Sequence, residues 1–236
     1  MTTPLAGPPV RLVLFDVDGT LLSCGGRTRP LLGRSLDEVF GPVPGIESYD
    51  FAGRTDPRIV FDLATGAGHG AEEVRAALPR VRDRYCAILE EGLPAGSVAV
   101  LPGVAALLGR LAARADLALG LLTGNWRRGA EVKLARAGLA GRFGFGAFGD
   151  DALDRDELPP IALARAADAT GRRFAAAETL VIGDTLHDVA CARAHGMRCL
   201  AVATGGTTAE RLAAAGADWV VADLDAVGER VPGLLG

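Results

Sequence analysis

Lysine is nearly absent from this sequence: of the 25 basic side chains only one, Lys133, is a lysine. Arginine is therefore the general cation of the chain, and finding an arginine at a given position says little about its role. The single lysine is the more informative residue. The chain also lacks a basic tract and carries a net charge of −4, so the composition gives no sign of a nucleic-acid partner.

Cysteine pairs and long apolar runs are missing as well. No two cysteines of the sequence have CxxC spacing. This is typical of reduced, buried thiols in the cytoplasm. No apolar run reaches the ~20 residues that a membrane helix needs. The opening MTTPLAGPPV lacks the basic start and apolar core of a secretion signal. We therefore expect a cytoplasmic protein, a monomer or homodimer, without a membrane or nucleic-acid partner.

The pattern of the chain predicts an α/β fold. A length of 236 residues suits one large domain with a smaller insert. Apolar strand-like segments alternate with helical segments, and this alternation predicts βαβ units and a parallel sheet with helices on both faces. The expected strands lie at residues 10–15, 117–123, 143–149, 179–184, 198–204 and 218–224.

Residues 27–91 differ in character, because they show helical periodicity and no clear strand. A helix is expected over residues 56–64, with Asp56 as its N-cap residue and Pro57 in its first turn. Residues 71–91 are expected to be helical on both sides of a break at Pro79. This region therefore predicts an all-helical insert.

Polar residues follow the strands where they end. In the stretch LFDVDGT, Asp16 and Asp18 lie two residues apart, and both carboxylates would lean into one small volume if the strand runs on through Asp18. Ligands of open α/β sheets bind beyond the carboxyl ends of the strands. The other strand ends supply Thr123, Asn125, Asp150, Asp151, Asp184 and Asp188.

The chemistry of these residues predicts a metal and phosphate site. Carboxylates without a histidine or cysteine core suit a hard cation such as Mg²⁺, and Mg²⁺ in turn suits phosphate. The Thr123 hydroxyl, the backbone amides after it and one cation would bind the phosphate. For Asp150 and Asp151, capping of the next helix is a sufficient explanation.

Three motifs in this order, DVDGT (16–20), LLTGN (121–125) and VIGDTLHD (181–188), resemble those of the haloacid dehalogenase superfamily of phosphohydrolases. The resemblance extends from about residue 10 to residue 225. It implies a Rossmann-like catalytic core at residues 1–21 and 101–236, with a helical cap domain and its linkers at 22–100. It also implies that Asp16 is the nucleophile, which becomes an aspartyl-phosphate, and that Asp18 is the general acid and base.

The resemblance also implies which residues bind the metal ion and which bind the phosphate. The metal ligands are Asp16, Asp18 through its backbone carbonyl, and Asp184, with Asp188 in support. The phosphate ligands are Thr123, Gly124 and Asn125, together with a cation that is normally a lysine.

That lysine is missing from its usual position. Arg155 stands there and is the first candidate to replace it, while Lys133, on the helix after LLTGN, is the second. In the cap, the polar loop GRTDP (53–57) offers Arg54 and Thr55 as contacts to a substrate.

The motifs look most like those of the phosphoglycolate phosphatase branch and predict a Mg²⁺-dependent phosphatase of a small phosphorylated metabolite. A phosphomutase of the β-phosphoglucomutase type would keep the same core residues and is the alternative enzyme. A regulatory protein without turnover is a third possibility. The intact motif residues argue against it; they are Asp16, Asp18, Thr123 and Asp184. A haloacid dehalogenase is disfavoured, because that chemistry does without Mg²⁺ and its branch is not normally acidic at the position of Asp18.

Overall fold

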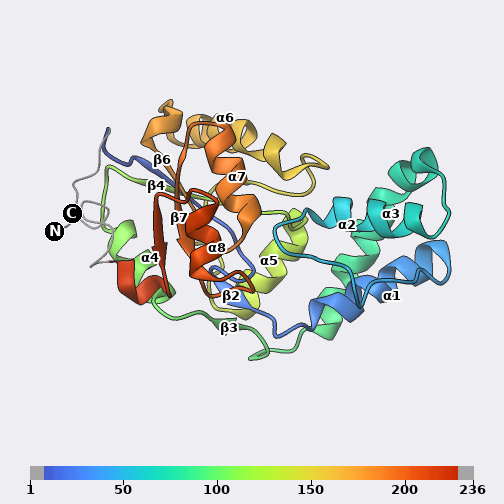
Figure 1. Ribbon diagram of the computed structural model, residues 1–236. Helices are drawn as coiled ribbons and strands as arrows, with labels where there is room; N and C mark the ends of the chain where they lie inside the picture. The colour runs from blue at the N-terminus through green and yellow to red at the C-terminus, as the bar shows by residue number, and fades with distance from the viewer. Residues whose placement is uncertain (1–7, 228–236) are drawn as a thin grey trace.

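A six-stranded parallel sheet forms the centre of the protein (Figure 1). The computed structural model describes residues 8–227 of the chain. Within this range the strands lie in the order β5-β4-β1-β6-β7-β8, so that the chain crosses over β4 and β1 between β5 and β6. Their bounds are Leu12–Phe15 (β1), Ala118–Leu122 (β4), Gly146–Ala147 (β5), Thr179–Gly183 (β6), Arg198–Val202 (β7) and Trp219–Val221 (β8).

Helices cover both faces of this sheet, because side chains alternate between the faces of a strand. In β1, Val13 and Phe15 pack on the face covered by α4 and α5, whereas Leu12 and Leu14 pack on the face covered by α6, α7 and α8. The helices are α4 (Val104–Ala112), α5 (Arg127–Arg136), α6 (Leu158–Thr170), α7 (Leu186–Ala194) and α8 (Ala209–Ala214), with 3₁₀ turns at Arg155–Glu157 (η1), Ala176–Glu178 (η2) and Leu224–Ala226 (η3).

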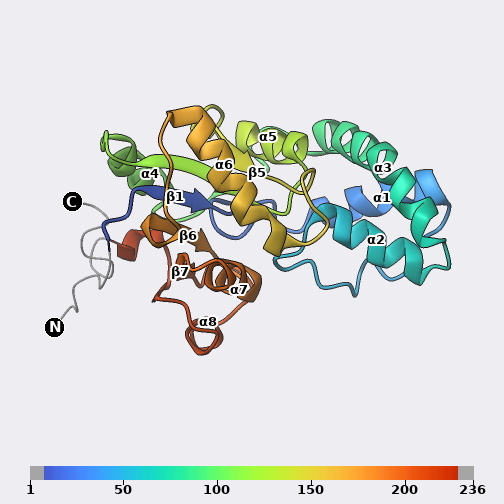
Figure 2. The same cartoon turned by 90° about the horizontal axis from the view of Figure 1, so that it is seen from above.

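Three further helices lie at the end of the molecule opposite α4 (Figures 1 and 2). They are α1 (Thr28–Phe40), α2 (Asp56–Gly66) and α3 (Ala71–Gly92). The chain enters and leaves this group through a two-stranded antiparallel ribbon of β2 (Leu22–Ser23) and β3 (Ala99–Val100). None of the helices within residues 8–227 is long and apolar enough to cross a membrane.

Helix α3 connects this helical group to the sheet, because it packs against α5. The rings of Tyr85 on α3 and Trp126 before α5 lie with their centroids 5.8 Å apart, and both residues are buried. Nearby, the Arg128 guanidinium pairs with the Glu90 carboxylate at 2.8 Å. The apolar interior therefore runs without interruption from the sheet into the helical group.

The parallel sheet with helices on both faces confirms the predicted fold class, but two local predictions were wrong. Helix α3 continues through Pro79 without a break. Because Pro79 is exposed, water can bind the Arg75 carbonyl that loses its donor. The N-cap residue of α2 is Thr55 rather than Asp56, since Thr55 Oγ1 accepts from the N–H of Arg58 at 3.2 Å.

The loop before α2 is docked onto the carboxyl end of the sheet. The N–H of Asp56 donates to the Gly124 carbonyl at 2.7 Å, and the Asp56 carboxylate accepts from the N–H of Trp126 at 2.8 Å. A Cβ atom at Gly124 would lie 2.2 Å from the carbonyl oxygen of Arg54. The two backbones therefore meet at a distance that only glycine permits.

We expect Gly124→Ala to lower the melting temperature by a few degrees, because overpacking against a backbone atom typically costs about 1–3 kcal/mol. The matched control is Gly109→Ala on α4, where an added Cβ has no atom within 4 Å. That variant should match or exceed the wild type, since alanine is the better helix former. Calorimetry of the three proteins makes the comparison, and an unchanged value for Gly124→Ala would show that the loop is not held against the sheet in solution.

Candidate active site

A cavity of about 310 Å³ opens at the carboxyl end of the sheet, between the strand ends and the helical group. Strands β1, β4 and β6 bring Asp16, Thr123 and Asp184 to it, and η1 brings Arg155. Three of the strand ends that the sequence expected to converge therefore lie together, whereas Asp150 and Asp151, after β5, do not line the cavity. The predicted site residues that line the cavity are Asp16, Asp18, Arg54, Thr123, Gly124, Asn125, Lys133, Arg155 and Asp184.

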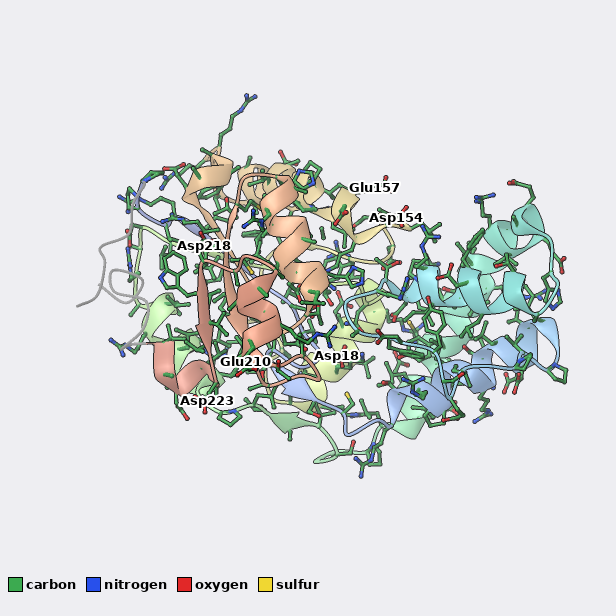
Figure 3. All side chains as sticks on the ribbon, in the orientation of Figure 1. Asp18, Asp154, Glu157, Glu210, Asp218 and Asp223 are labelled. Atoms are coloured by element: carbon green, nitrogen blue, oxygen red, sulfur yellow. The ribbon has the colours of Figure 1, made fainter. Side chains whose placement is uncertain are left out.

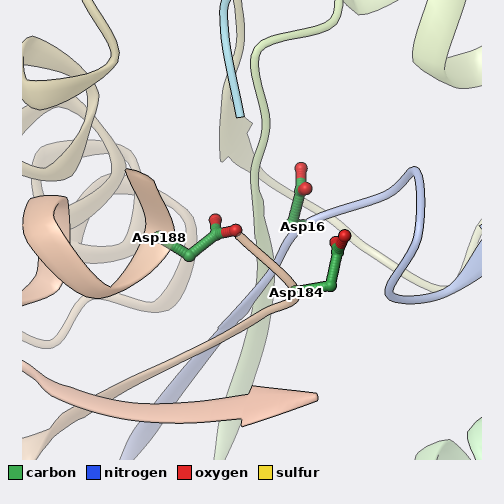
Figure 4. Close-up of side chains that lie close together, drawn as sticks. All are labelled: Asp16, Asp184 and Asp188. Atoms are coloured by element: carbon green, nitrogen blue, oxygen red, sulfur yellow. The ribbon is translucent and has the colours of Figure 1, made fainter. Parts of the chain in front are cut away.

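Three buried carboxylates, those of Asp16, Asp184 and Asp188, form a cluster at this edge (Figure 4). One oxygen atom of each lies within 4.8 Å of the others. Burial raises the pKa of Asp184, and the carboxylates of Asp16 and Asp188 raise it further. Burial likewise raises the pKa of Asp16, and the charge of Arg155 opposes that shift. We call these three residues the acidic cluster.

Hydrogen bonds fix the two members of the acidic cluster that follow β6. The Thr20 hydroxyl donates to Asp184 Oδ1 at 2.9 Å. Asp188, in the first turn of α7, accepts from the N–H and the hydroxyl of Thr185 at 3.0 and 2.6 Å. This reciprocal capping box aims the Asp188 carboxylate back toward the strand end.

The turn after β1 separates Asp18 from the acidic cluster. Strand β1 ends at Phe15, and Gly19 turns the chain with a φ of 81°. A Cβ atom at Gly19 would lie 2.4 Å from Asp184 Oδ2, so this turn requires glycine. Strand β1 thus ends at Phe15, as the sequence predicted, and it does not run on through Asp18. The Asp18 carboxylate lies outside the cluster, on the side of the core that faces α1–α3 (Figure 3).

Arg155 is the cation of the acidic cluster. Its guanidinium donates to Asp188 Oδ1 at 2.5 Å and lies 3.2 Å from Asp16 Oδ1. The same group donates to the backbone carbonyls of Leu122 and Gly53, each at 3.2 Å. Because Arg155 is only 6% exposed, these charges interact in a medium less polar than water. The arginine thus contacts the predicted nucleophile and the docked loop at once.

Lys133 is a second buried cation, with other partners. Its Nζ donates to Asp18 Oδ2 at 2.6 Å and to Asn125 Oδ1 at 2.5 Å. Burial alone would lower the pKa of Lys133, but the nearby Asp18, Tyr85 and Asp56 raise it overall, so the ammonium stays charged. Both candidates for the missing lysine are therefore in the site, and each pairs with a different catalytic candidate.

The charges of the site indicate a divalent cation. The three carboxylates of the acidic cluster face one guanidinium, that of Arg155, so two negative charges remain unbalanced. Asp18 and Lys133 balance each other. Carboxylate oxygens without histidine or cysteine are the donors that hard cations prefer. The acidic cluster therefore fits a hard divalent metal ion.

The docked loop brings Arg54 to the cavity and turns Thr55 away from it. The Arg54 guanidinium lies 3.7 Å from Asp62 and over the ring of Tyr49. Thr55 is 1% exposed and does not line the cavity, and its hydroxyl donates to the Leu153 carbonyl at 2.6 Å. The expected substrate contact of Thr55 is therefore corrected: its hydroxyl caps α2 and joins the loop to the core.

The structure adds residues that the sequence did not single out. Gly205 and Gly206 follow β7 and line the cavity, and a Cβ at Gly205 would lie 1.8 Å from Asp184 Oδ2. Their position directly after a strand could have indicated that they belong to the site. A glycine has no functional side chain, however, so the sequence alone did not identify them. Thr20 lies inside DVDGT, yet its bond to Asp184 joins residues 164 positions apart, which no local pattern reveals.

A family model described as haloacid dehalogenase-like hydrolase matches residues 13–193. This chain belongs to the haloacid dehalogenase-like hydrolase family. The match spans the motifs that supply the acidic cluster, Arg155 and Lys133, so the resemblance that the sequence suggested is confirmed.

Two similar members of the haloacid dehalogenase-like hydrolases are phosphoglycolate phosphatases. The enzyme of Synechococcus elongatus is 30% identical over 212 residues, which cover 90% of this chain and 92% of its own. The enzyme of Rhodospirillum rubrum is 29% identical over 226 residues, which cover 93% of this chain and 90% of its own. The crystal structure of CbbY from Rhodobacter sphaeroides in complex with phosphate has a TM-score of 0.66 at 22% identity, covering 95% of this chain and 99% of its own. At that identity it shows the fold alone.

We expect Asp184→Asn to stabilise the metal-free protein at neutral and alkaline pH. Because burial raises the pKa of Asp184 in the folded state, stability falls as the pH rises above the pKa of the unfolded chain, and the loss is complete once the pH has passed the folded pKa. Below the pKa of the unfolded chain both states are protonated, and the cost disappears. The asparagine keeps an oxygen for the Thr20 hydroxyl. Melting temperatures in EDTA should therefore agree at acid pH and diverge in favour of the variant as the pH rises.

The matched control is Asp168→Asn, which alters an exposed carboxylate of α6 and should show no such divergence. Added Mg²⁺ should favour the wild type, because a ligand that binds the folded state stabilises it. A wild type more stable than Asp184→Asn in EDTA at every pH would contradict the argument.

Proposed function

We propose that the protein is a Mg²⁺-dependent phosphatase that hydrolyses a small phosphate monoester through an aspartyl-phosphate on Asp16. One observation carries the proposal: Asp16 is buried beside Arg155 within the acidic cluster, at the wall of a cavity that Asp18 also lines. That the protein is a hydrolase of phosphoric monoesters follows from its family and from relatives of about 30% identity that are phosphatases.

The acidic cluster would hold the Mg²⁺ ion. Asp16 and Asp184 would bind it with the backbone carbonyl of Asp18, and Asp188 would support the site. When bound, the ion supplies positive charge that lets a carboxylate approach a phosphate dianion. Its demand for oxygen ligands at short distance matches a cluster made only of carboxylates.

The remaining groups act on the phosphoryl group and the leaving group. An Asp16 oxygen attacks phosphorus while Asp18 gives a proton to the departing oxygen, and the resulting Asp18 carboxylate then takes a proton from the water that hydrolyses the aspartyl-phosphate. Thr123, Gly124 and Asn125, at the end of β4, line the cavity and would bind the phosphoryl oxygens.

The helical group would act as the cap domain, residues 22–100, over a core formed by residues 1–21 and 101–236. Its part of the cavity wall includes the apolar side chains of Leu32, Phe51 and Ile59, and the guanidinium of Arg54. Such a wall suits a small leaving group with one acceptor or anionic end. The relatives make phosphoglycolate the first substrate to test.

We expect the purified protein to release orthophosphate from 2-phosphoglycolate with Mg²⁺ and to lose this activity in EDTA. Asp16→Asn should abolish turnover, because an amide does not attack phosphorus, while the fold remains intact. Ca²⁺ should inhibit, since it prefers more ligands at longer distances. Phosphate release, metal titration and circular dichroism supply the measurements.

The outcomes separate the candidate functions. Near-normal turnover by Asp16→Asn would contradict the mechanism, and full activity in EDTA would contradict the metal site. A phosphomutase would instead convert a hexose 1-phosphate to its 6-phosphate with little release of orthophosphate.

We expect Arg54→Ala to raise KM for 2-phosphoglycolate by about 10–100-fold, because a hydrogen bond to a charged group contributes about 1.5–3 kcal/mol. Hydrolysis of 4-nitrophenyl phosphate, which has no carboxylate, should change much less. The matched control is Arg58→Ala, which removes an arginine of α2 that pairs with Asp154 and does not line the cavity. Equal effects of Arg54→Ala on both substrates would assign Arg54 to stability rather than to recognition.

A further inference from the structure

The contacts of Lys133 leave it poorly suited to bind a phosphoryl group. Its side chain is 4% exposed, and its ammonium is held between Asp18 Oδ2 at 2.6 Å and Asn125 Oδ1 at 2.5 Å. Asp18, by contrast, has a side chain that is 40% exposed. The lysine therefore reaches the cavity wall with almost no exposed surface, beside the more exposed Asp18.

Asn125 binds both Lys133 and the oxygen atom that Lys133 contacts, Asp18 Oδ2. Its Nδ2 donates to Asp18 Oδ2 at 2.8 Å and to the Thr123 hydroxyl at 2.8 Å, while its Oδ1 accepts from Lys133. Asp18 Oδ2 thus accepts from two donors, one of them cationic. An oxygen that is already bound by two donors is a poor site for a proton, so Oδ1 is the oxygen of Asp18 that can carry the transferable proton.

The other buried cation has a separate task. Arg155 contacts Asp16 and Asp188, and its contacts with neutral groups are to two backbone carbonyls. The cation of the nucleophile and the cation of the acid are therefore different residues in this chain, and they come from different helices.

We propose that Lys133 is a positioning residue for Asp18: it holds Oδ2 so that Oδ1 faces the leaving group, and its charge stabilises the Asp18 carboxylate that forms as the proton departs. The proposal rests on the proposed phosphatase function. In the step concerned, an Asp16 oxygen forms a bond to phosphorus and the bond from phosphorus to the leaving oxygen breaks. That oxygen keeps the electron pair and takes the proton of Asp18, which yields an alcohol, an aspartyl-phosphate and a carboxylate on Asp18.

The test compares two substrates that differ in their need for an acid. 4-Nitrophenyl phosphate releases a stable anion, whereas phenyl phosphate, of similar size, releases a much more basic one. Lys133→Met should lower kcat/KM for phenyl phosphate by about 10²–10³, within the usual range for a general acid, and for 4-nitrophenyl phosphate by less than about 10-fold. The quantity kcat/KM is used because it reports the steps up to departure of the leaving group.

Three comparisons make the result specific. Lys133→Arg keeps the charge and should restore part of the lost selectivity between the substrates. Arg155→Met is the matched variant of the other cation, and it should lower kcat/KM for both substrates alike. The inhibition constant of inorganic phosphate should change little in Lys133→Met, because the lysine is not a phosphate ligand.

Equal losses for both substrates in Lys133→Met, together with at least 10-fold weaker inhibition by phosphate, would overturn the proposal and make Lys133 a phosphate ligand. If Lys133→Met does not fold by circular dichroism, Lys133→Gln, which keeps N–H donors but no charge, is measured in the same way and against the same outcomes. The proposed function is judged separately, by whether the wild type hydrolyses either ester with Mg²⁺ and Asp16→Asn does not.

Discussion

Balancing buried negative charge at one edge of a parallel sheet is the constraint on which the rest of this structure depends. The acidic cluster and Asp18 gather four carboxylates at this edge, and three of them, those of Asp16, Asp18 and Asp184, line the cavity. An unpaired charge in such surroundings is strongly destabilising. The two cations, Arg155 and Lys133, come from η1 and α5, so Asp16, Asp18 and Asp188 gain their cationic partners only once distant segments have packed.

Much of this arrangement could be predicted from the sequence, because apolar runs that end in carboxylates are local patterns. The strand before Asp184 was predicted to within one residue, while the one over 143–149 shrank to Gly146–Ala147, an edge strand among glycines. The partners of Lys133 were beyond prediction. Its bond to Asp18 spans 115 positions, and no local pattern shows that Asp18 lies outside the acidic cluster.

The docked loop connects the helical group to the chemistry through a single guanidinium. Arg155 donates to the Gly53 carbonyl on one side and contacts Asp16 on the other. A movement of the helical group away from the sheet would remove one of the acceptors that hold this arginine. The geometry at Asp16 therefore depends on the position of a loop that belongs to the substrate-facing half of the cavity.

The near absence of lysine has a consequence for the chemical reactivity of the folded chain. The exposed cations of residues 8–227 are guanidinium groups, and the only side-chain amine of the sequence belongs to Lys133, which is 3% exposed. Reagents that acylate or alkylate amines would therefore find a single side-chain target, buried in the cavity wall beside Asp18. Its rate of labelling would report how often the cavity wall opens, without any probe having to be introduced into the protein.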